Sequence, residues 1–135
     1  MNSRNQASRA AQREPAETVY AEELAKLRGM DHGPVPPGWQ MSPRAVEKFV
    51  MGDEKLGIER KFVADRAMVV RIIISLCTSR GCLLVGEPGT AKSWLSELLS
   101  AAISGSSTLT LQGGAVSQVG QLLYSWNESV LHNEG

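Results

Sequence analysis

The pattern of apolar and polar residues predicts a helix directly after a proline-rich linker. Ser42 is a good N-cap, Pro43 suits the first helical position, and Gly52 is a natural stop. Between them lies one apolar face, made of Val46, Phe49 and Val50. Before the linker, residues 13–28 carry a thin apolar stripe among charges and predict a short helix.

Two further helices are predicted on either side of a glycine-containing loop. The first opens at Asp65 and has apolar residues at helical spacing, although its β-branched run over 69–74 would equally suit a strand. We expect a helix there, because the next segment makes the better strand. The second helix starts at Lys92 and ends at Gly105, and Trp94 falls on its apolar face, which favours a core or interface role.

Two short segments are expected to be strands. Residues 82–85 form a continuous apolar run between glycines, which is typical of a strand buried on both faces of a parallel sheet. Residues 108–111 alternate and predict a second strand, and residues 115–126 predict another amphipathic helix. The order of these elements predicts the α/β class, as the first part of a three-layer αβα domain with a parallel sheet. Residues 1–40 are expected to be a flexible, partly helical tail with a Pro-rich linker, and 41–135 the layered domain.

Charge and hydropathy exclude several classes of partner. Lys+Arg and Asp+Glu number 14 each, so no net charge attracts nucleic acid or an anionic membrane. The chain has no apolar run long enough to span a bilayer and no secretory signal at its start. We therefore expect a cytoplasmic protein that binds neither nucleic acid nor a membrane. Every Lys and Arg lies at or before Lys92, which suggests that the last part of the chain associates with something else.

The stretch GEPGTAKS, between the first predicted strand and the helix at Lys92, is the candidate phosphate-binding loop. A position between a strand and a helix is the context in which this motif indicates phosphate binding, because the helix N-terminus and the backbone N–H groups of the loop can hold a phosphate. Lys92 is suited to neutralising the phosphates and Ser93 to binding Mg²⁺, whereas Glu87 should point to solvent. The predicted nucleotide site consists of Gly86, Glu87, Pro88, Gly89, Thr90, Ala91, Lys92 and Ser93.

Ala91 stands where the consensus phosphate-binding loop has its second glycine. If this position needs a positive φ, alanine costs about 1–2 kcal/mol. If it already belongs to the helix, alanine is favoured by roughly 0.5–1 kcal/mol. A lysine beside a phosphate oxygen is worth on the order of 4 kcal/mol, so neither case removes binding.

The same stretch, with the apolar run before it, resembles the Walker A region of MoxR-type AAA+ ATPases, where alanine is usual at this position. Residues 111–114 and 121–127 are similar to a second motif in one branch of that family, with departures at Gly114, Leu123 and Ser125. The resemblance covers roughly residues 43–135. It implies a P-loop NTPase domain that binds ATP and Mg²⁺. It also implies ring assemblies that remodel partner proteins, often ones with a von Willebrand A domain.

The chain has no segment suited to hydrolysing ATP. No apolar strand ending in Asp-Glu follows Lys92, and no Arg follows Arg80, so we assign no catalytic residue. The expectation is therefore the N-terminal portion of an ATPase, either part of a longer enzyme or a small product that binds nucleotide without turnover. The alternative is a non-enzymatic interaction module that docks to a larger ATPase. A small P-loop kinase is disfavoured, because no acceptor-binding or lid residues can be identified.

Overall fold

The computed structural model describes residues 13–109 of the 135-residue chain, and helices make up most of their regular structure. One antiparallel bridge, between Asp53 and Ile58, stands alone within this range. The helices are α2 (Ala16–Val19), α3 (Ala21–Met30), α4 (Pro43–Met51), the 3-10 helix η1 (Glu54–Leu56), α5 (Arg66–Cys77) and α6 (Lys92–Ser104). No helix among these residues has the length and apolar character needed to cross a membrane.

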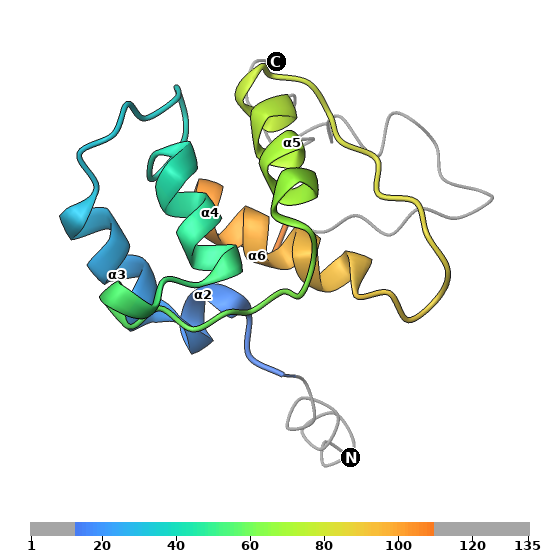
Figure 1. The fold of residues 1–135 in the computed structure, drawn as a ribbon, viewed down its shortest axis with the longest axis horizontal. Helices are drawn as coiled ribbons and strands as arrows, with labels where there is room; N and C mark the ends of the chain where they lie inside the picture. Colours follow the sequence, from blue (N-terminus) through green and yellow to red (C-terminus); the bar gives the residue numbers. More distant parts are fainter. Residues whose placement is uncertain (1–12, 110–135) are drawn as a thin grey trace, which may run out of the picture.

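Helix α4 is the centre of the packing. It contacts α3, α5 and α6, while α2 contacts α3 and α6 (Figure 1). The connection from α5 to α6, drawn in yellow, swings away from the other helices before it returns at Lys92 (Figure 1). The helices share one core, whose largest fully buried side chains include Leu24, Met41, Val46, Phe49, Val50, Val69, Leu95 and Leu98.

The start and end of α4 are confirmed. Ser42 is the N-cap, and its Oγ accepts a hydrogen bond from the Ala45 N–H at 3.3 Å. Asp31 holds this cap in place by accepting from the Ser42 N–H at 2.5 Å and from its Oγ at 2.6 Å. Burial alone would raise the pKa of the Asp31 carboxyl, but the hydrogen bonds from Ser42 and Gly33 outweigh it and leave that pKa lowered. The linker is thus tied to the helix that it precedes.

The helices predicted from Asp65 and from Lys92 are confirmed as well. Where one short helix was predicted over residues 13–28, the structure has two, α2 and the greater part of α3, which are separated by Tyr20. Asp65 caps α5 by accepting from the Ala67 N–H, so the segment with the β-branched run is a helix and not a strand. Gly105 ends α6 in the left-handed conformation, with φ +80°.

The predicted αβα layering with a parallel sheet is wrong for the described residues, because no strand forms among them. Residues 82–85 carry no regular structure, and Leu83 and Val85 are 86% and 85% exposed. A strand needs a neighbour to pair its backbone groups, and the apolar run by itself does not supply one. Thr108 and Leu109 also lie outside any strand, and Leu109 is 91% exposed. The rest of the second predicted strand and the helix expected over 115–126 lie outside the described residues.

Candidate nucleotide-binding site

The loop over residues 86–92 closes on the side chain of Lys92. The Lys92 ammonium donates to the carbonyl oxygens of Gly86 at 2.7 Å and Glu87 at 2.6 Å, and to Thr90 Oγ1 at 3.1 Å. An ammonium has three protons, so these three acceptors satisfy it. The Thr90 hydroxyl in turn donates to the Glu87 carbonyl at 2.8 Å. The lysine therefore lies inside the turn of the loop instead of extending into solvent.

The two glycines of the loop are constrained in different ways, Gly89 by its backbone conformation and Gly86 by close neighbours. Gly89 has φ +85°, a conformation that other residues rarely adopt. A Cβ at Gly86 would lie 3.2 Å from Thr90 Oγ1 and 3.6 Å from Cδ of Lys92. A side chain at Gly89 would be strained by the backbone, and one at Gly86 would require Thr90 to shift slightly.

Ala91 is the residue that places Lys92 at the start of α6. Its φ is +57° and its ψ +27°, so of the two cases raised by the sequence, the structure has the strained one. The Ala91 carbonyl accepts the first helical hydrogen bond from the Leu95 N–H at 3.0 Å. Its side chain cannot cap the helix, so the N–H groups of the first turn are left for solvent or a ligand.

Replacing Ala91 by glycine is expected to stabilise the chain slightly. The substitution removes about 1–2 kcal/mol of left-handed strain and adds roughly 0.5–1 kcal/mol of chain-entropy cost, leaving a gain of up to about 1.5 kcal/mol. Ala25→Gly is the matched control, because Ala25 is exposed in the middle of α3 and should lose about 1 kcal/mol. Urea unfolding measures both changes. Equal destabilisation by the two substitutions would show that Ala91 is not strained.

Lys92 and Ser93 border a hollow of about 650 Å³ along one side of α6. Three further α6 residues, Ser96, Glu97 and Ser100, border it too, and its other walls are Cys82, Leu84, Ser107 and Leu109. Glu87 and Pro88 are exposed, so the expectation that Glu87 points to solvent is confirmed. Lys92 and the hydroxyl of Ser93 therefore lie beside the same solvent-accessible hollow.

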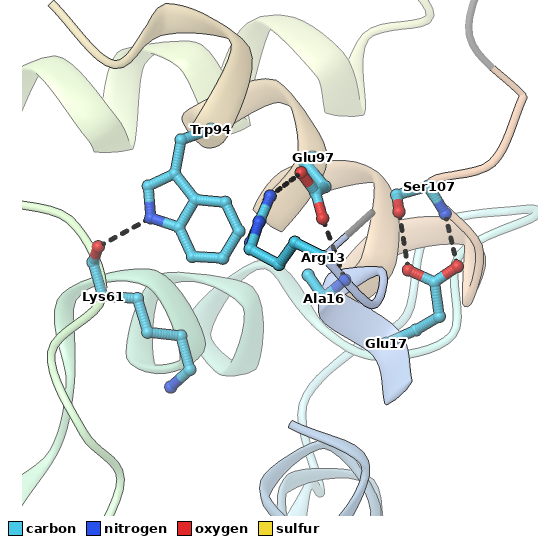
Figure 2. A network of polar contacts seen from close by, with 7 residues as sticks. All are labelled: Arg13, Ala16, Glu17, Lys61, Trp94, Glu97 and Ser107. Carbon is cyan, nitrogen blue, oxygen red and sulfur yellow. Dashed lines mark hydrogen bonds and ion pairs between the residues drawn. The ribbon is translucent and has the colours of Figure 1, made fainter. Parts of the chain in front are cut away.

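A set of contacts around α6 was not predicted from the sequence. Figure 2 shows Arg13 and the Ala16 backbone at the carboxylate of Glu97, and the carboxylate of Glu17 at Ser107. Burial would raise the pKa of the Glu17 carboxyl, but the hydrogen bonds from Ser107 outweigh it and lower that pKa. These partners are far apart in sequence. The sequence places Glu97 one helical turn after Ser93, but it carries no signal of the partners that Glu97 contacts.

Two comparisons with known proteins bear on this site. Residues 81–134 match the AAA domain of the dynein-related subfamily, a range that includes the whole loop and α6. The chain is also 53% identical over 124 residues to the Escherichia coli (strain K12) protein YehL, which is described as uncharacterized. That match covers 92% of this chain but 34% of YehL, so the chain spans about a third of the length of this relative. No solved structure matches the chain.

The AAA match makes residues 81–134, which contain the loop, similar to a nucleotide-binding AAA domain. It supports the expected resemblance to AAA+ ATPases at this broad level, and ATP is the nucleotide that such a domain implies. The MoxR-type branch, the roles of the individual loop residues and the domain boundaries stay predictions.

Proposed function

We propose that residues 86–93 bind the phosphate groups of ATP together with Mg²⁺, in an AAA+ ATPase of the MoxR type. The observation that supports this most is the position of the Lys92 ammonium, which the carbonyls of Gly86 and Glu87 hold at the start of an uncapped helix. A positive charge beside free helical N–H groups is a favourable environment for an anion, and a bound phosphate oxygen would replace one of the loop acceptors that now satisfy the ammonium. The AAA match over the same residues supports the choice of a nucleotide.

The proposed roles follow from chemistry and position. Lys92 neutralises the outer phosphates, and Gly86 and Gly89 let the backbone of the loop approach them. Ser93 is exposed at the edge of the hollow, where its hydroxyl suits one ligand position of Mg²⁺. Mg²⁺ usually takes few protein ligands and keeps phosphate oxygens and waters, so a single hydroxyl fits it. Within residues 13–109, no cluster of His, Cys, Asp and Glu could hold a metal ion on its own.

Hydrolysis is proposed to need residues that these 135 do not contain, supplied by further sequence or by neighbouring copies in a ring. Remodelling of a partner protein, including one with a von Willebrand A domain, belongs to the same proposal. One observation favours the alternative of a non-enzymatic docking module: Leu83, Val85 and Leu109 are each more than four-fifths exposed. Steady ATP hydrolysis by residues 1–135 alone would contradict the docking module, and it would equally contradict the proposal that hydrolysis needs residues beyond these.

Calorimetric titration of the chain with ATP and Mg²⁺ tests the binding proposal. We expect ATP to bind at one site per chain, inorganic pyrophosphate to compete with it, and adenosine to bind far more weakly, because the loop contacts phosphate. Adenosine binding as tightly as ATP would contradict the proposal, and so would the absence of ATP binding.

A further inference from the structure

Residues 13–20, called here the N-terminal strap, lie across α6 and are fixed at two places. At the first, the carboxylate of Glu97 accepts from the Arg13 guanidinium at 2.6 Å and from the Ala16 N–H at 2.9 Å (Figure 2). At the second, the carboxylate of Glu17 accepts from the Ser107 N–H at 3.0 Å and from its Oγ at 2.7 Å. Glu97 also takes the place of an N-cap for α2, since Pro15 offers no capping side chain.

The strap also contacts the first turn of α6, directly after the loop. The Arg13 guanidinium lies 4.3 Å from the ring centroid of Trp94, which follows Lys92 by two residues. The Tyr20 ring centroid is 6.3 Å from that of Trp94, and the indole N–H donates to the Lys61 carbonyl at 3.0 Å. The beginning of α6 is therefore held by the strap on one side and by the segment before α5 on the other.

Glu97 is a carboxylate on the surface where a phosphate is proposed to bind. It lies one turn after Ser93 on the same face of α6, and both residues border the hollow beside Lys92. An unpaired carboxylate there would repel a phosphate chain, because like charges disfavour each other at short range. The Arg13 guanidinium balances that charge in the structure.

We propose that the N-terminal strap is part of the nucleotide site, with Arg13 as a positioning residue that neutralises Glu97 and anchors the first turn of α6. This inference rests on the proposed function. It makes nucleotide binding dependent on a docked strap, and by thermodynamic reciprocity nucleotide binding also strengthens the docking.

Arg13→Gln tests the inference by leaving the Glu97 carboxylate without its guanidinium. We expect the dissociation constant for ATP with Mg²⁺ to rise about fivefold, the lower end of typical coupling between sites. The double variant Arg13→Gln/Glu97→Gln should recover most of the affinity, because the charge on the hollow is removed. Arg44→Gln, at an exposed position in α4, is the matched control and should leave the affinity unchanged.

Two further readouts separate charge balance from a general loss of structure. The Arg13–Glu97 pair is exposed on the arginine side, with 57% of that side chain accessible, so Arg13→Gln should hardly change the melting temperature. In a variant that keeps Trp94 as its only tryptophan, ATP should change the fluorescence, and Arg13→Gln should reduce that change.

The outcomes distinguish this inference from the proposed function. If the wild-type chain binds no nucleotide, both fall. If it binds ATP and Arg13→Gln binds equally well, the strap proposal alone is overturned. A double variant as weak as Arg13→Gln also overturns it, because a lost charge balance would then not be the cause.

Discussion

Replacing Lys92 by alanine is expected to remove ATP–Mg²⁺ binding almost entirely. The substitution deletes the one cation that the loop itself provides, which three loop acceptors hold at 2.6–3.1 Å. The attraction between the Lys92 ammonium and a phosphate oxygen is worth on the order of 4 kcal/mol at an effective dielectric of 20. This corresponds to up to roughly a thousandfold in affinity. Isothermal titration calorimetry on the 135-residue chain measures the change.

The controls separate the charge of Lys92 from the packing of its side chain. Lys92→Met keeps an unbranched stem but has no ammonium, so it should bind ATP as poorly as the alanine variant. Lys55→Ala removes an exposed lysine from η1 and should bind like the wild type. Wild-type affinity in Lys92→Ala would refute the assignment of the loop as the phosphate site.

The sequence predicted the helices of the described range well, because their signals are local. Ser42, Gly52, Asp65 and Gly105 mark helix ends through their own side chains or backbone conformation, and each occupies the predicted position. The predicted strand over 82–85 failed, because pairing depends on a second segment that a short apolar run does not identify. Local chemistry was therefore a better guide than the inferred layering.

The candidate site shows the same division between local and distant information. The spacing of Gly86, Gly89 and Lys92 predicted a loop, but two alternatives were open for Ala91 until its positive φ was seen. The contact between Arg13 and Glu97 joins residues 84 positions apart. No periodicity or motif in a single sequence reports such a pair, so the strap emerged only from the structure.

Phe49→Ala is expected to have the largest effect on stability, lowering the free energy of unfolding by about 3–5 kcal/mol. Phe49 is fully buried in α4, the helix that contacts α3, α5 and α6. Its ring meets that of Tyr20 edge to face, with centroids 5.9 Å apart, and lies 4.4 Å from the Lys61 ammonium. The Lys61 side chain is only 1% exposed, so truncating Phe49 leaves a cavity next to a buried charge.

Urea unfolding measures this loss, and Val63→Ala is the control, since Val63 is 87% exposed and should change stability by less than about 0.5 kcal/mol. A loss below about 1 kcal/mol in Phe49→Ala would mean that α4 is not the centre of the core.

The comparison with Lys92→Ala is informative, because the Lys92 contacts are exposed and stay within residues 86–92. Lys92→Ala should therefore lose ATP binding with little loss of stability. Phe49→Ala should lose stability while the loop keeps its lysine and its acceptors. Such opposite results would place nucleotide binding in the loop and folding in the helical core.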